Sequence, residues 1–115
     1  MSTEQHRKML ECAAKACGIT GVWQKGFGIC VIGDYLKDPG EQVKFWNPLA
    51  NSADCAAMCA KLEIDTIWSD GAVICADDSR EREQEVRHDG TDAGKEAAWR
   101  LAASMVAAKV GGYSE

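Results

Sequence analysis

The sequence has no cluster of basic residues, no long apolar run and only two prolines in 115 residues. Its 13 lysines and arginines are spread along the chain and are outnumbered by 18 carboxylates, which gives a net charge of -5. Direct nucleic-acid binding normally needs a basic face that neutralises phosphates, so we expect none. A membrane-spanning helix needs ~20 apolar residues in succession. No stretch approaches that length, and we expect no membrane partner.

The common motifs of nucleotide-binding enzymes are also missing. A dinucleotide fingerprint needs a helix that starts inside its glycines, whereas Gly26 and Gly28 lie in a predicted hairpin. No phosphate-loop lysine is followed by serine or threonine. The carboxylates between residues 77 and 85 form a charge run of the kind that is usually a solvated surface. We therefore expect a protein that is not an enzyme and that uses no cofactor.

Alanine dominates the apolar content. The chain has 17 alanines against 20 isoleucines, leucines, valines and phenylalanines. Four tryptophans must supply much of the buried area, since each aromatic side chain can bury roughly 150–250 Å². The length fits a single domain over residues 1–115. A domain of this size has modest stability, which makes a homodimer plausible.

Capping residues and apolar spacing predict three helices. The first, capped by Ser2 or Thr3, runs to about Cys17, and Gly18 closes it. The second follows a cap at Asn51 or Ser52 and ends near residue 62. The third is expected over 92–110, and its apolar face is assigned to Ala98, Leu101, Ala102, Met105 and Ala108.

Two hairpins are expected between the helices. Their strands are predicted over residues 19–23 and 29–32, and over 64–68 and 72–76. A loop with a turn at 38–40 is expected over 34–42, followed by an extended piece over 43–46. The charged segment 77–89 fits either an exposed hairpin loop or a charged edge strand. The sequence thus predicts an α+β fold, in which an antiparallel or mixed sheet of about four strands packs against three helices.

The two halves also share a spacing that favours a duplicated α-β-β unit. Trp23 precedes Cys30 by seven residues, and Trp68 precedes Cys75 by the same number. Each interval covers a strand, a turn and a strand.

Six cysteines need an explanation in a chain whose early residues do not resemble a secretory signal. Residues 3–8 are polar or charged, and we expect a cytoplasmic protein with reduced, buried thiols. Cys12 with Cys17 and Cys55 with Cys59 lack the tight knuckle of structural zinc sites, and neither His6 nor His88 has a partner at ligand spacing. No metal site is therefore predicted.

A thiol nucleophile remains an alternative. Cys55 lies near the start of the second helix, where a thiolate is best stabilised. His88 is then the candidate base, because His6 falls in the first turn of the chain.

Two features could contact a protein partner. Phe45 and Trp46 precede Asn47-Pro48-Leu49, and Trp46 could either plug the sheet or anchor a partner. The carboxylates Glu81, Glu83 and Glu85 could complement a basic partner.

The chain resembles a group of small tailed-bacteriophage and prophage proteins with a Trp-Asn-Pro-Leu motif, and more distantly the phage NinX-like proteins. The resemblance rests on Trp23 and on segments 13–19, 46–49, 54–64 and 97–111. The chain departs from the group at residues 50–53, where the group has an Asp-rich stretch, and at Glu63, where the group tends to have glycine.

The resemblance implies expression in the bacterial cytoplasm but carries no catalytic residue. We therefore expect an accessory protein that binds a host or phage protein, such as an inhibitor of a host defence or regulatory factor. The alternatives are a metal- or thiol-dependent protein that uses the cysteines, and a self-associating module that dimerises through the Ala-rich last helix.

Overall fold

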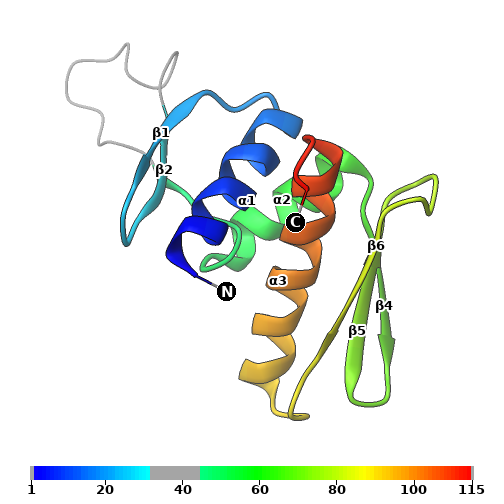
Figure 1. Ribbon diagram of the computed structural model, residues 1–115. Coiled ribbons are helices and arrows are strands. Elements are labelled where there is room, and N and C mark those ends of the chain that lie inside the picture. Colours follow the sequence, from blue (N-terminus) through cyan, green and yellow to red (C-terminus); the bar gives the residue numbers. More distant parts are fainter. Residues whose placement is uncertain (1, 32–44, 115) are drawn as a thin grey trace.

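The computed structural model describes residues 2–31 and 45–114. Its helices are α1 (Thr3–Ala16), α2 (Ser52–Leu62) and α3 (Asp92–Val110) (Figure 1). Sheet A consists of β1 (Gly21–Gln24), β2 (Gly28–Val31) and β3 (Phe45–Trp46). Sheet B consists of β4 (Asp65–Ser69), β5 (Ala72–Ala76) and β6 (Glu83–Arg87). All neighbouring strands are antiparallel, so the α+β class and both hairpins are confirmed.

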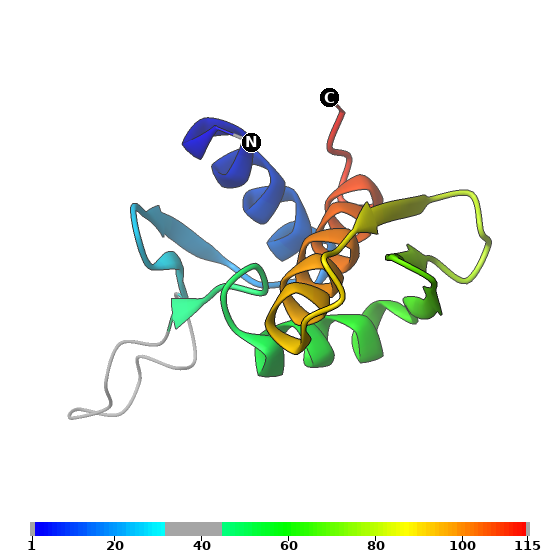
Figure 2. The same cartoon turned by 90° about the horizontal axis from the view of Figure 1, so that it is seen from below.

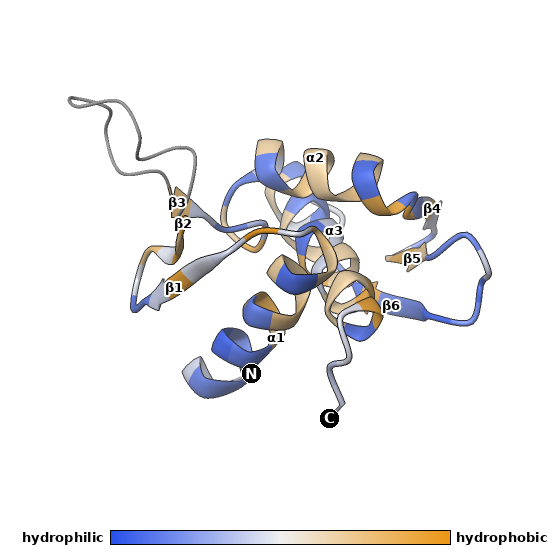
Figure 3. Cartoon of the chain, turned by 90° about the horizontal axis from the view of Figure 1, so that it is seen from above, coloured by the Kyte–Doolittle hydropathy of each residue, from blue (hydrophilic) through white to orange (hydrophobic). Residues whose placement is uncertain are grey.

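The prediction of one sheet with about four strands is wrong in that detail. Each hairpin gains a third strand, and the two sheets remain separate. Figures 2 and 3 show the reason: the helices lie between the sheets. α1 packs against β1 and β2, whereas α3 packs against α1, α2 and the strands β5 and β6. Each sheet therefore buries one face on its own helix and leaves the other face outward.

The element order partly supports the duplicated unit. In both halves a helix precedes three antiparallel strands. The registers differ, however, because Val22 pairs with Cys30 whereas Thr66 pairs with Cys75. The covering helices differ as well, since sheet A rests on α1 and sheet B rests on α3. Duplication therefore stays a hypothesis about the origin of the chain.

The predicted helix ends agree closely with the structure. The Ser2 hydroxyl accepts a hydrogen bond from the Gln5 amide, and the Gln5 side chain accepts one from the Ser2 amide. This reciprocal pair is a capping box. Asn51 caps α2 and Thr91 caps α3. Gly18 follows α1 with a φ of 72°, the left-handed conformation that glycine adopts without a steric penalty.

The charged segment after β5 contains both structures that the sequence allowed. A turn occupies the residues before Glu83, and β6 then runs along the edge of sheet B. The turn is fixed by Asp77, which accepts hydrogen bonds from the backbone and guanidinium of Arg82 at 3.2 and 2.9 Å. These hydrogen bonds lower the pKa of Asp77. The loop predicted over 34–42, with its turn at 38–40, lies outside the described residues.

α3 is the centre of the core. Residues 102–108 are all buried, so two turns of this helix contact other elements on every side. The predicted single apolar face is therefore incomplete, and Leu101 on that face is only half-buried. Ala98, Ala102, Ala103, Ala107 and Ala108 are buried inside the chain, whereas Ala93 and Ala97 in the first turns of α3 are exposed.

The contact between α1 and α3 leaves no room for a side chain at Gly111. A Cβ atom there would overlap the backbone carbonyl of Cys12. Gly111 has a φ of −81°, which any residue adopts, so the restriction at this position is purely one of space.

We expect Gly111→Ala to lower the free energy of unfolding by about 1–3 kcal/mol, the usual cost of overpacking a core. The control is Val110→Ala, at a side chain that is 36% exposed, where we expect a change within about 0.5 kcal/mol. Urea unfolding measures both changes, provided that the slope of the free energy of unfolding against urea concentration is the same in each variant as in the wild type. Equal midpoints for Gly111→Ala and the wild type would show that the two helices separate freely.

Candidate functional site

The outward face of sheet B combines apolar and acidic side chains. Side chains alternate along a strand, and Val73 and Cys75 point inward, where both are fully buried. Ile74, Ala72 and Ala76 therefore point outward, and of these three only Ile74 is partly exposed. Across the three strands, Ile67 pairs with Ile74 and Ile74 with Glu85. Ile67 is 41% exposed, although isoleucine is usually buried.

The neighbouring row adds two more carboxylates. Asp65 pairs with Ala76, and Ala76 pairs with Glu83. We call Asp65, Ile67, Ile74, Glu83 and Glu85 the sheet B face. It is an apolar centre with carboxylates along two strands, and Asp65 also contacts Arg80 at 3.8 Å. Arg87 points outward at the far end of β6, so the face carries one basic side chain beside its carboxylates.

Two of the three carboxylates predicted as partner contacts thus lie together on this face. Glu83 and Glu85 are exposed and two residues apart on β6. Glu81 belongs to the preceding turn, where its amide donates to the Ser79 hydroxyl. The sequence indicated these acids by their charge alone. It gave no sign of Ile67 and Ile74, because their position beside the acids depends on the register of sheet B.

Phe45 and Trp46 point to opposite faces of sheet A. Trp46 pairs with Ile29, is 6% exposed and belongs to the core. Phe45 points the opposite way, is 39% exposed and stacks on Phe27 at a ring distance of 5.1 Å. Trp46 therefore plugs the sheet as part of the core. The outward aromatic residues beside sheet A are Phe45 and Phe27, and Phe27 was not predicted.

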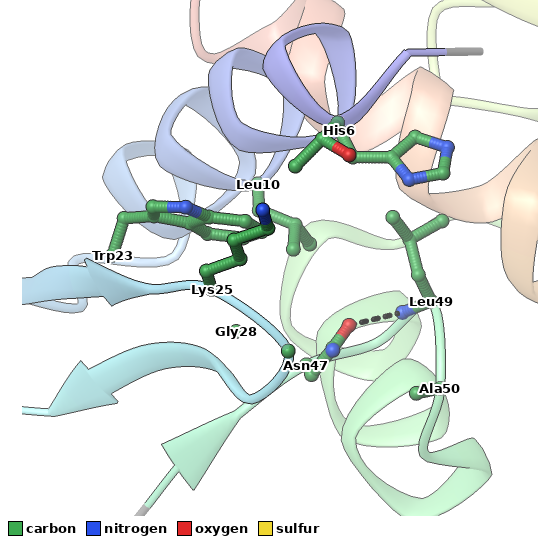
Figure 4. Close-up of a pocket in the computed structure, with 10 residues that line it drawn as sticks. His6, Leu10, Trp23, Lys25, Gly28, Asn47, Leu49 and Ala50 are labelled. Atoms are coloured by element: carbon green, nitrogen blue, oxygen red, sulfur yellow. Dashed lines mark hydrogen bonds between the residues drawn. The ribbon is translucent and has the colours of Figure 1, made fainter.

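A cleft of about 370 Å³ opens beside the other face of sheet A (Figure 4). One wall comes from Trp23 and Lys25 at the end of β1, and another from His6 and Leu10 on α1. The third wall is the turn that contains Asn47 and Leu49. Sequence reasoning missed this cleft because its residues come from three separated segments. The His6 and Trp23 that line it gave no signal of their proximity.

The cysteines divide into two groups, and all six are free thiols within the described ranges. Cys17, Cys55 and Cys75 are buried, whereas Cys12, Cys30 and Cys59 are half-buried. Burial raises the pKa of Cys17, and it raises the pKa of Cys75 to about 11. Among the described residues no group of three or more His, Cys, Asp or Glu side chains is placed to hold a metal ion.

The structure does not bring Cys55 and His88 together. The neighbouring Cys59 thiol and burial together raise the pKa of Cys55. His88 lies at the far end of sheet B. There its amide donates to the carbonyl of Gly71, and its ring meets the edge of Trp68. A Cys55–His88 nucleophile is therefore ruled out by position as well as by the raised thiol pKa.

Comparison of the chain with protein-family models, with curated proteins and with solved structures gives no match. Within the two described ranges, none of the helices has the length and apolarity needed to cross a membrane.

We expect the half-buried thiols Cys12, Cys30 and Cys59 to be alkylated first in the native protein at pH 8. The buried thiols should react at least about tenfold more slowly, the factor given by a local opening that costs 1.4 kcal/mol. Mass spectrometry of the digested protein after timed labelling measures each rate. Labelling of Cys55 as fast as Cys59 would contradict the structure and favour a thiol-dependent activity.

We expect Trp46→Ala to lower the free energy of unfolding by about 3–5 kcal/mol, because it leaves a large cavity in the core. Phe45→Ala is the matched control, since the neighbouring side chain faces outward, and we expect it to cost about 1 kcal/mol. Denaturant unfolding followed by circular dichroism distinguishes the two. An unchanged transition for Trp46→Ala would mean that the side chain is free to act as an anchor.

Proposed function

We propose that this protein is a non-enzymatic accessory protein of a phage or prophage that acts by binding a protein of the host or of the phage. In the most specific form of the proposal it inhibits a host defence or regulatory factor that has a basic surface. The observation that carries the proposal is the sheet B face, where Ile67 and Ile74 lie beside Asp65, Glu83 and Glu85.

The chemistry of this face favours a protein partner. The centre of a protein interface is apolar and its rim is polar. Complementary charge accelerates encounter and selects against wrong partners. Glu83 and Glu85 supply negative charge in an otherwise acidic chain, so a basic surface is the complement. Many nucleic-acid-binding proteins carry such a surface.

The sheet B face is held firmly by α3. The Trp99 indole on α3 donates a hydrogen bond to the Thr66 hydroxyl on β4 at 3.1 Å. At the opposite edge of the same inner face, the Lys109 ammonium donates to the Gln84 side chain on β6 at 3.2 Å. Both outer strands are therefore fixed to the same helix, and a rigid surface loses little conformational entropy on binding.

The edge of the sheet argues for docking on the face. β6 is an edge strand, and an unpaired edge invites pairing with a strand of another chain. Exposed charges such as those of Glu83, Glu85 and Arg87 oppose edge pairing. Side-chain contact with the sheet B face is then the favoured mode.

Self-association is the second candidate function, and sheet A provides its observation. Val22, Cys30 and Phe45 form one row across the strands, with Phe27 stacked on Phe45. Val22 is 52% exposed and Phe27 is 62% exposed. An apolar row of this kind fits a second copy of the chain better than a basic surface.

Affinity capture from bacterial lysate with three variants tests the proposal. We expect the wild type to retain one stoichiometric partner at moderate salt, where the screening length falls below about 8 Å. The double variant Glu83→Gln with Glu85→Gln should bind the partner at least about tenfold more weakly, because both charges face the partner. A tenfold rise in Kd is a loss of about 1.4 kcal/mol of binding free energy. Glu4→Gln with Glu11→Gln removes the same charge from exposed positions on α1 and should bind normally.

Phe27→Ser separates the two candidate surfaces. Loss of the partner with Phe27→Ser and not with the Glu83 and Glu85 variant would move the interface to sheet A and overturn the sheet B assignment. A dimer in solution that Phe27→Ser dissociates would favour self-association. Equal loss in both double-glutamine variants would show that only net charge matters.

A further inference from the structure

The cleft beside Trp23 has the size and the lining of a small-molecule site. Its volume of about 370 Å³ falls within the range of ~300–1,000 Å³ that ligand pockets occupy. Figure 4 shows Trp23 and Lys25 on one side, His6 and Leu49 on the other, and Leu10 between them. The combination of an aromatic wall, two leucines and a few polar groups is typical of such pockets.

The aromatic wall is held in place by the core. Trp23 pairs with Ile29, which pairs in turn with Trp46 on the same inner face of sheet A. Ile29 and Trp46 are buried, and Trp23 packs partly against the same core. The indole is therefore half-buried with its position fixed. An aromatic side chain of this kind favours stacking on the flat ring of a ligand.

The polar groups of the cleft carry positive charge or can donate hydrogen bonds. They are the Lys25 ammonium, the His6 imidazole, the Thr3 hydroxyl and the Asn47 amide. Asn47 uses its side-chain oxygen to accept from the Leu49 amide at 3.1 Å, which leaves its NH₂ group for a ligand. No carboxylate is among the described residues that line the cleft, although the chain as a whole has a net charge of -5.

The third wall is fixed before any ligand arrives. The backbone N–H of Asn47 donates to the Asp54 carboxylate at 3.0 Å, and the Arg100 guanidinium of α3 donates to the Leu49 carbonyl at 3.0 Å. Gly28 has a φ of 99°, and a Cβ there would come within 2.7 Å of both Asn47 Cβ and the Trp46 carbonyl oxygen. Such close packing keeps the turn against sheet A, and a pre-formed site loses less entropy on binding.

We propose that this cleft binds a small anion that carries a flat aromatic ring. The ring would lie against Trp23 between Leu10 and Leu49, and the anionic group would meet Lys25, His6 and the Asn47 amide. Charge-assisted hydrogen bonds to a phosphate or carboxylate are the strong ones in such a site. A nucleoside monophosphate and an aromatic carboxylate share this chemistry. The site is separate from the sheet B face, so it stands whether or not the protein-binding proposal holds.

Calorimetry with the full chain and five probes tests the ligand class. Adenosine monophosphate and indole-3-acetate carry both a ring and a charge, whereas adenosine and indole lack the charge and ribose 5-phosphate lacks the aromatic ring. We expect at least one of the first two to bind, and its incomplete counterparts to bind at least about tenfold more weakly. Which of the two binds more tightly distinguishes a nucleotide from a carboxylate ligand. No binding of either with a Kd below about 1 mM would overturn the proposal.

Lys25→Gln is the decisive variant, because Lys25 is exposed in the β1–β2 turn and supports no part of the core. We expect it to weaken binding of the charged probe about tenfold, with no change for the uncharged ring. Lys8→Gln is the control: it removes the same charge from an exposed position on α1 that does not line the cleft. We expect this variant to bind the charged probe as the wild type does. Equal affinity in Lys25→Gln and the wild type would contradict the assignment of the anion to this cleft.

Trp23→Leu tests the ring contact. We expect it to weaken the aromatic probes and to leave ribose 5-phosphate unchanged. A folded-state control by circular dichroism is needed, because Trp23 also packs against the core. Lys25→Gln keeps the proposal testable if Trp23→Leu does not fold.

Discussion

The close packing of α3 between α1 and sheet B is the constraint on which the rest of the fold depends. Small side chains allow it: Ala102, Ala103, Ala107 and Ala108 are fully buried, and Gly111 meets the backbone of α1 directly. A core with few large aliphatic residues gains stability from close contact over many small side chains. One enlarged residue on α3 would therefore push apart elements on two sides at once.

This central helix also explains why there are two sheets. α1 and α3 contact each other and form a layer of helices. Each sheet covers one side of that layer (Figures 2 and 3). The arrangement leaves two outward sheet faces of different character. Sheet A carries Phe27 and Phe45, whereas sheet B carries Ile67 and Ile74 beside carboxylates.

What the sequence could predict follows from the range of each interaction. The helix caps at Ser2 and Asn51 and the hairpin over residues 64–76 depend on neighbouring residues, and all are present in the structure. Phe45 and Trp46 must point in opposite directions in an extended strand, but which of them faces inward depends on the pairing of β3 with β2, which the sequence did not specify. The cleft depends on three segments meeting, and the position of Ile74 beside Glu85 depends on register. Candidate sites built from such contacts are not visible in a single sequence.

The charge distribution gives the two candidate sites different physical requirements. On the sheet B face, Glu83 and Glu85 add to the overall negative charge, so both the local and the long-range fields attract a basic partner. In the cleft, the Lys25 ammonium acts against the field of the whole chain, so an anion is attracted only at short range. Added salt therefore weakens binding at the sheet B face, where the attraction is long-ranged. At the cleft, salt screens both the attraction of the anion to Lys25 and its long-range repulsion by the acidic chain. The affinity of the cleft should therefore fall less with added salt than the affinity of the sheet B face. Selectivity in the cleft then depends on the ring contact with Trp23 together with the short-range contact of Lys25.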